Sequence, residues 1–382
     1  TESSSLEAAA TIANGNVRFS LDHPIEVKKG SSEASMRRFY TEVPVDLKRL
    51  YNVAYIISAA QQNSSFLERN TLNLMTLFSS SEPGKLMPMT DTTFDSGANA
   101  FWSKSQLKED TKLILLSYIP LLRYYQSGNF FSYKYPEDDK YSGTKQRIYN
   151  DMVLPLTGAE GLEVRFDYLN FWEPYFEMNC EGDVCRPQSV SITMFGYPFS
   201  MQRYKAVYDI SYPVLVSLRD KNAFDGQGYT FSFALEANVR NNRPAFDGVM
   251  LPMQSAFEES LLCDENQRNS GNISVVVRDA YSAMPVENAQ VSFVLDSESC
   301  AIGATGEGGV LLSQFPIALG GVVHAVAPDY VGSIRALDTS LGEQAIVDVE
   351  LSKYVELKVG VEKKKVVKCV RSTASSGGVL TP

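Results

Sequence analysis

The chain has very little histidine and none of the usual short motifs of catalysis. Its 382 residues include only two histidines, His23 and His324, and neither G-x-S-x-G nor H-E-x-x-H occurs. Phosphate-binding loops, dinucleotide fingerprints and repeated metal-ligand spacings are absent as well. We therefore expect no catalytic constellation, no metal and no cofactor, and we predict that the protein is not an enzyme.

Long hydrophobic runs and basic clusters are also lacking. No stretch approaches the ~20 apolar residues that span a bilayer, and the opening residues TESSSLEAAATIANG show no charged-then-apolar signal. We expect any targeting or anchoring segment to lie outside this chain. The 35 Lys and Arg against 45 Asp and Glu give a net charge of −10, so nucleic acid is an unfavourable partner.

The five cysteines are Cys180, Cys185, Cys263, Cys300 and Cys369. A zinc site would need a second close pair or nearby histidines, and the short segment CEGDVC has neither. We therefore predict disulfides Cys180–Cys185, contributing about 2 kcal/mol, and Cys263–Cys300, contributing about 4 kcal/mol because its loop is longer. Cys369 is left for a partner beyond this chain.

Two sequons, Asn63-Ser64-Ser65 and Asn272-Ile273-Ser274, match the acceptor pattern for N-glycosylation. Such triplets also arise by chance, so glycosylation at Asn63 and Asn272 is an expectation that rests on the pattern alone. Together with the disulfides, the sequons predict an extracellular or cell-surface location.

The first half of the chain mixes the hydrophobic periods of helices and strands. Val17, Phe19 and Leu21 alternate as in a half-buried strand, and helical spacing predicts helices over residues 47–63 and 66–78. A third helix is expected after a Ser103–Gln106 capping box and is interrupted at Pro120.

From about residue 160 the period becomes two, most clearly over 208–218 and 229–239. The connection RDKNAFDGQG has Asp220, Asn222 and Gly226 at positions that suggest a calcium loop, but Phe224 breaks the ligand order, which favours an ordinary hairpin turn. Beyond Cys263 short strands alternate with turns, which predicts a small β-sandwich. We expect an α+β body with a largely antiparallel sheet and a few helices, followed by this all-β sandwich. The predicted ranges are 1–15 for a linker or tail, 16–262 for the body, 263–358 for the sandwich, and 359–382 for a C-terminal strand and linker or tail.

The C-terminal part carries a family resemblance in VVRDAYSAMPVENAQVSFVL, IGATGEGGVLL, VVHAVAPDYVGSIRALD and VDVELSKY. These segments resemble the carboxypeptidase-regulatory-like, or transthyretin-like, β-sandwich. Asp279, Pro285, Ala289, Thr305 and Gly309 stand at the family's turn and strand positions, and Asp329-Tyr330-Val331 stands where the family often has a Gly-Tyr step. The resemblance implies a scaffold or spacer of this Ig-like class and no reactive group.

The whole chain looks like uncharacterised cell-surface proteins of archaea. The segments that carry this resemblance are VRFSLDHPIEVKKG, VPVDLKRLYNVAYII and YPVLVSLRDKNAFDGQGYTFSFALEANVRNN ahead of a cysteine-bridged sandwich. The resemblance implies a surface location and no catalytic residues.

The segment FWEPYFE is the best enzymatic or ligand-binding candidate. Trp172, Glu173, Tyr175 and Glu177 combine paired carboxylates with aromatic platforms, as glycoside hydrolysis or sugar binding would use. Pro174 argues against one helical face for both carboxylates, and the alternative is an aromatic edge packed on its neighbour with solvated glutamates.

A lysine run near the C-terminus, VEKKKVVKC with Lys363, Lys364, Lys365 and Lys368, either contacts an anionic polymer or guards a strand edge. With both ends reading as tails, we predict a non-enzymatic extracellular structural protein, acting in adhesion or as a subunit of a filament or surface assembly. Its expected partners are further copies of itself or other surface proteins. The alternative is a carbohydrate-binding or glycan-processing ectodomain.

Overall fold

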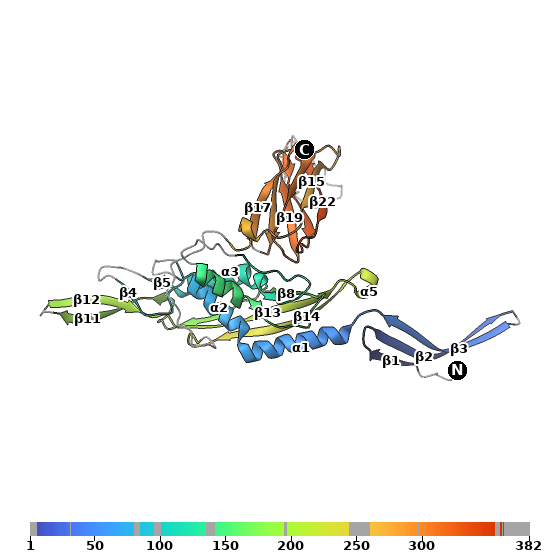
Figure 1. Cartoon of the computed structure of the whole chain (residues 1–382), viewed down its shortest axis with the longest axis horizontal. Coiled ribbons are helices and arrows are strands. Elements are labelled where there is room, and N and C mark those ends of the chain that lie inside the picture. Colours follow the sequence, from blue (N-terminus) through green and yellow to red (C-terminus); the bar gives the residue numbers. More distant parts are fainter. Residues whose placement is uncertain are drawn as a thin grey trace, which may run out of the picture.

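The computed structural model describes residues 6–30, 32–79, 85–94, 101–134, 142–194, 197–243, 260–296, 298–355, 360 and 362. It confirms the predicted α+β body followed by a β-sandwich. A small sheet at the N-terminal end projects from the body, and the sandwich stands on the opposite side of the body from helix α1 (Figure 1). No helix in these ranges is both long enough and apolar enough to cross a membrane.

The projecting N-terminal sheet is an antiparallel meander of three strands, β1 (Glu7–Ile12), β2 (Val17–Lys29) and β3 (Ser32–Val43). The first turn contains Asn14 and Gly15, with Gly15 at φ +81°, and an Asn-Gly pair favours such tight turns. The prediction of a linker or tail over residues 1–15 is therefore wrong for β1. The half-buried strand predicted from Val17 is present, but it is exposed along most of its length, with Phe19 45% exposed.

The helices of the body begin where the sequence supplies capping side chains. They are α1 (Leu47–Ser64), α2 (Phe66–Leu77), α3 (Lys104–Tyr118) and α4 (Ser142–Asp151). The Asp46 carboxylate accepts from the amide of Arg49 at 3.1 Å, and the Ser103 hydroxyl accepts from the amide of Gln106 at 3.3 Å. The third helix ends in a 3-10 turn, η1 (Ile119–Leu121), which contains Pro120 as expected.

The central sheet of the body has the order β14-β13-β8, and β9 also pairs with β13. The strands are β8 (Glu163–Asp167), β9 (Tyr175–Met178), β13 (Tyr208–Asp220) and β14 (Tyr229–Val239). Alternate residues of β13, from Tyr208 to Leu218, are buried, and helices α1 and α2 lie against β14. The turn between β13 and β14 contains the short helix α5 (Ala223–Gly226) and closes a hairpin, with Asp220 opposite Tyr229.

Shorter strands surround this sheet. They are β4 (Thr92–Phe94), β5 (Trp102–Ser103), β6 (Arg123–Tyr124), β7 (Val153–Leu154), β10 (Val184–Cys185), β11 (Gln188–Met194) and β12 (Tyr197–Tyr204). The sheet β11-β12-β4 extends from the end of the body away from β1–β3 (Figure 1). The molecule is therefore elongated, with a thin sheet at each end of the body.

The sandwich packs two four-stranded sheets, β18-β15-β22-β20 and β17-β16-β19-β21. Its core includes Phe293 and Phe315, whose rings meet edge to face with centroids 5.7 Å apart. The strands β15 and β22 are parallel, with Ile273 opposite Ala345. The bounds are β15 (Ile273–Asp279), β16 (Gln290–Leu295), β17 (Glu298–Ala304), β18 (Val310–Ser313), β19 (Gly321–Val326), β20 (Tyr330–Val331), β21 (Ser333–Leu337) and β22 (Ala345–Lys353), with short 3-10 turns η2 (Glu265–Gln267) and η3 (Glu307–Gly309).

Candidate functional site

The two glutamates of FWEPYFE are held by lysines of helix α3. Glu173 pairs with Lys108 at 3.0 Å and Lys112 at 2.5 Å, and Glu177 pairs with Lys104 at 2.9 Å. Hydrogen bonds from Lys112 and Lys108 lower the pKa of the Glu173 carboxyl. A general acid of a glycosidase needs a raised pKa, so this carboxylate has the opposite electrostatic setting.

The aromatic side chains of the same segment make contacts within the protein, although Phe171 and Tyr175 are both exposed. Trp172 packs against the core and Tyr175 has the guanidinium of Arg240 over its ring at 5.3 Å. Phe171 is 75% exposed and meets Trp172 at a tilt of 68°. These contacts, with those of the glutamates, attach the segment to α3 and to Arg240, which follows β14.

The cysteines predicted to pair lie together. Cys180 and Cys185 are joined across the turn from β9 to β10, and Cys263 is joined to Cys300 of β17, each pair with Cα atoms 4.9 Å apart. Cys369 and the four lysines of VEKKKVVKC lie outside the described residues.

The sequon asparagines Asn63 and Asn272 are both exposed, Asn63 in the last turn of α1 and Asn272 just before β15. Among the described residues no three His, Cys, Asp or Glu side chains are close enough to hold a metal ion.

Asp279, the first residue of the transthyretin-like pattern, organises a turn. Its carboxylate accepts from the amides of Tyr281 at 2.9 Å and Ser282 at 2.8 Å, and from the Tyr330 hydroxyl at 3.0 Å. The two amide bonds are the main reason why the pKa of Asp279 falls to about 2.

The other residues of that pattern also hold the backbone. The amide of Ala289 donates to the Thr305 hydroxyl at 2.9 Å, and that hydroxyl donates to the carbonyl of Val286 at 2.8 Å. Gly309 has φ +69°, and Pro285 forms an isolated bridge with Arg278. Each of these residues fixes the path of the sandwich backbone.

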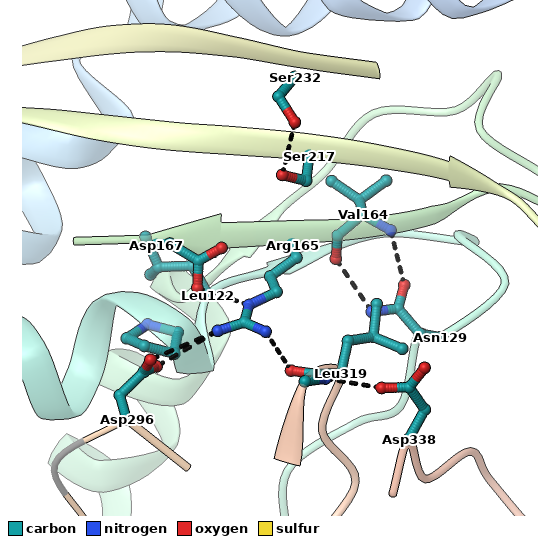
Figure 2. A network of polar contacts seen from close by, with 12 residues as sticks. Leu122, Asn129, Val164, Arg165, Asp167, Ser217, Ser232, Asp296, Leu319 and Asp338 are labelled. Atoms are coloured by element: carbon teal, nitrogen blue, oxygen red, sulfur yellow. Dashed lines mark hydrogen bonds and ion pairs between the residues drawn. The ribbon is translucent and has the colours of Figure 1, made fainter. Parts of the chain in front are cut away.

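The junction between body and sandwich is built around Arg165 of β8 (Figure 2). Its guanidinium contacts the Asp167 carboxylate at 2.5 Å, donates to the carbonyl of Leu319 at 2.5 Å and lies 3.4 Å from Asp296. Burial raises the pKa of both Asp167 and Asp296, and the nearby Arg165 acts in the opposite direction. Leu319 and Asp296 belong to the sandwich, so one arginine ties the two parts.

Two further arginines cross the same junction. The buried guanidinium of Arg123 donates to the carbonyl of Ile317 at 3.2 Å, and Arg219 pairs with Asp338. The space left between Arg123, Arg165 and Ile317 is only about 10 Å³, which is too small for a ligand. The junction is therefore a packed joint that fixes the sandwich on the body.

Where β1, β2 and β3 lie side by side, one face of the N-terminal sheet is apolar and largely uncovered, and the other carries charged side chains together with Tyr40, which is 80% exposed. Directly opposite residues of antiparallel strands share a face, so the register places three rows on one side. These rows are Ala8, Leu21 and Phe39; Ala10, Phe19 and Thr41; and Ile12, Val17 and Val43. Of these nine residues only Val17 is buried.

A shallow hollow of about 470 Å³ lies on this sheet, lined in part by Ala8, Ala10, Phe19 and Phe39. The opposite side carries Arg18, which pairs with Glu42 at 2.7 Å, and Arg38, which lies 3.5 Å from Asp22. The sheet is therefore a single amphipathic layer that lacks a second layer.

Sequence reasoning missed this surface although the signals were present. Asn14-Gly15 marks a hairpin turn, and the alternation of apolar residues continues on both sides of it. The segment EAAATI of β1 was predicted to be a tail because its alanines show little hydrophobic contrast.

Comparisons with known proteins give little further guidance. No protein-family model matches the chain, and no curated protein matches it. Solved structures with weak similarity include the Bacillus anthracis TIE protein, with 9% identity and TM-score 0.19 over 55% of this chain and 44% of that one. Others are a group B streptococcus pilus 2b backbone protein, with 8% identity and TM-score 0.18 over 50% and 84%, and BcpA, the major pilin subunit of Bacillus cereus, with 9% identity and TM-score 0.17 over 51% and 57%.

The chain thus spans less than half the length of the TIE protein. Because these TM-scores are all below 0.2, the similarities carry no argument about function. The resemblances to the carboxypeptidase-regulatory-like family and to archaeal surface proteins stay predictions.

Proposed function

We propose that this protein is a non-enzymatic structural subunit of an extracellular surface assembly, and that it associates through its N-terminal sheet. The observation that carries the proposal is the uncovered apolar face of β1–β3, which projects from the body (Figure 1). A sheet with one apolar face is stable when another layer covers that face. Exposed apolar patches of this kind mark association surfaces.

Two other features support a structural role. The sandwich is fixed on the body by the three junction arginines Arg123, Arg165 and Arg219, so body and sandwich keep one relative orientation. The disulfides Cys180–Cys185 and Cys263–Cys300 suit an oxidising exterior.

The carbohydrate-binding alternative has less support. Its two glutamates are engaged by Lys104, Lys108 and Lys112, and the guanidinium of Arg240 lies over the ring of Tyr175. Binding of a glycan there requires these contacts to be replaced.

The test compares two substitutions that introduce the same charge on neighbouring residues of β2. Phe19→Asp places a carboxylate on the apolar face, whereas Ser20→Asp places it on the polar face opposite Tyr40. We expect concentration-dependent oligomers of the wild-type full chain in sedimentation velocity, loss of them in Phe19→Asp, and their retention in Ser20→Asp.

Electron microscopy of the same samples shows whether the oligomers are ordered assemblies. A wild-type chain that sediments as a monomer at every concentration, with only single particles in the images, overturns the proposed function. Equal loss in both variants also contradicts it.

A further inference from the structure

The nine residues of the apolar face are uncharged and differ in side-chain size, and Arg37, which follows Phe39 on the same side of β3, pairs with the Asp22 carboxylate at 2.7 Å. On β1 the residues Ala8 and Ala10 are small, whereas β2 and β3 present Phe19, Leu21 and Phe39. The hollow of about 470 Å³ lies where the alanines meet these larger side chains. A partner must therefore bring an uncharged surface with a bulky side chain that fits over the alanine strand.

The charges of the sheet argue against other classes of occupant. Residues 7–43 contain five basic and five acidic side chains, so the sheet has no net charge. A nucleic acid or an anionic lipid surface is attracted by basic residues in excess, and here there is no excess. The groups concerned are Arg18, Lys28, Lys29, Arg37 and Arg38 against Glu7, Asp22, Glu26, Glu33 and Glu42.

Resting on the function proposed above, we infer that the occupant is the same face of a second copy of this chain, related by a two-fold axis parallel to β2. Rotation about that axis places β1 of one copy over β3 of the other, so that Ala8 faces Phe39 of the partner subunit. Facing layers pack well when large residues lie opposite small ones, and two such sheets pack about 10 Å apart. The face is therefore complementary to itself.

The rows of the sheet agree with this arrangement. At the axis, Phe19 of each copy meets its symmetry mate, and the small neighbours Ala10 and Thr41 leave room for the two rings. The end of the face that carries Val17 and Val43 already packs on the core of its own chain, so the rows of Ala8 and Ala10 make the contact between the two copies. A two-fold axis across the strands at the Phe19 row would instead place Ala8 over Ile12 and Phe39 over Val43 of the partner subunit, so the contact between Ala8 and Phe39 distinguishes the two arrangements.

The size of the face sets the strength of the pairing. Without the end that carries Val17 and Val43, three strands of about four residues cover about 14 Å by 13 Å, or roughly 200 Å² on each copy. Stable specific interfaces bury about 1,200 Å² or more in total, so this contact alone is small. We expect a reversible dimer whose dissociation constant lies near the micromolar range.

The experiment exchanges the two side chains that the two-fold axis brings together. Phe39→Ala removes the bulky group, Ala8→Phe fills the hollow, and each is expected to weaken dimerisation of the full chain at least about tenfold. The double variant Ala8→Phe/Phe39→Ala restores the small-to-large match and is expected to recover most of that loss. Arg38→Ala, next to Phe39 but on the polar face and outside the hollow, is the matched control and leaves association unchanged.

A crosslink tests the geometry directly, in a Cys369→Ser background. A chain carrying Ala8→Cys mixed with a chain carrying Phe39→Cys should form a heterodimer linked by a short bismaleimide reagent, because a spacing of about 10 Å between the sheets is too wide for a disulfide. Circular dichroism confirms that each variant is folded. The double variant and the crosslink both depend on Ala8 lying opposite Phe39 of the second copy, which a merely structural role of Phe39 would not produce.

The outcomes separate this inference from the proposed function. Association that persists without rescue, and without a crosslink between Ala8→Cys and Phe39→Cys chains, overturns the axis and leaves the proposed function standing. Binding of the wild-type sheet to neutral phosphatidylcholine vesicles, lost in Phe39→Ala and without dimers in solution, overturns the second copy as occupant. Monomers under all conditions overturn both.

Discussion

At the scale of single residues, two adjacent glycines allow the cost of backbone strain to be measured separately from the cost of a steric clash. Gly308 and Gly309 both have positive φ, at +75° and +69°. A Cβ on Gly308 meets nothing within 4 Å, whereas a Cβ on Gly309 would lie 2.6 Å from the carbonyl oxygen of Val277 and 2.9 Å from the amide nitrogen of Val286.

We therefore expect Gly308→Ala to cost about 1 kcal/mol of sandwich stability, the usual penalty for an L-residue in this region. Gly309→Ala should cost at least about 3 kcal/mol, because the strands β15 and β18 must separate to admit the methyl group. Urea unfolding followed through the sandwich transition measures both. Equal costs would contradict the close approach at Gly309.

Asp279 predicts a dependence of stability on pH. Its pKa falls from the ordinary 3.8 to about 2 because the amides of Ser282 and Tyr281 donate to the charged form. A carboxyl with a lowered folded-state pKa stabilises the fold above pH 3.8 and loses that contribution as pH falls towards 2.

The stability difference between wild type and Asp279→Asn should thus be constant above about pH 5 and shrink from pH 4 to pH 2. Chemical unfolding at a series of pH values tests this. A difference that stays constant down to pH 2 would show that the charge of Asp279 contributes nothing.

At the scale of elements, strand β8 connects the body to the sandwich through Arg165. Replacing it by methionine leaves Asp167 and Asp296 facing each other without their cation. Removal of one partner from such a partly buried pair costs about 3 kcal/mol, so the joint should loosen at neutral pH. Small-angle X-ray scattering and limited proteolysis between body and sandwich detect this, with Ser217→Ala on the neighbouring strand as the control.

Lowering the pH should have the opposite effect on the joint of Arg165→Met to the effect that it has on the contribution of Asp279. Burial raises the pKa of Asp167 and Asp296, so their neutral forms are favoured in the folded joint and the cost of ionisation appears as pH rises. In Arg165→Met the joint should tighten again as pH is lowered towards these raised pKa values. A joint that stays loose on acidification would rule out carboxylate repulsion as the cause.

The elements also show where sequence reasoning succeeds. The capping side chain Ser103 and the alternation through β13 and β14 are local signals, and the structure has the expected elements there. The β1 strand was missed because the alanines of EAAATI carry little hydrophobic contrast. The junction around Arg165 joins residues up to 154 positions apart. A local sequence pattern cannot predict a contact between residues so far apart.

At the scale of the whole molecule, the two disulfides constrain very different lengths of chain. Cys263–Cys300 encloses a separation of 37 residues and Cys180–Cys185 a separation of 5. In the loop-entropy account the longer one should contribute about 4 kcal/mol and the shorter about 2 kcal/mol.

Thermal unfolding of Cys263→Ala/Cys300→Ala and of Cys180→Ala/Cys185→Ala, each compared with the wild type, measures the two contributions. We expect the larger fall in Tm for Cys263→Ala/Cys300→Ala, because this disulfide closes the longer loop. The reverse order would mean that loop length is not what governs their effect.

The parallel pairing of β15 with β22 has a mechanical consequence. These strands are the first and last long strands of the sandwich, and they align from Ile273 opposite Ala345 to Asp279 opposite Leu351. Tension applied between the start of β15 and the end of β22 pulls the two strands past each other, so their hydrogen bonds resist together in shear and cannot open one at a time. A sandwich connected in this way transmits a pulling force along its length without unravelling from either end.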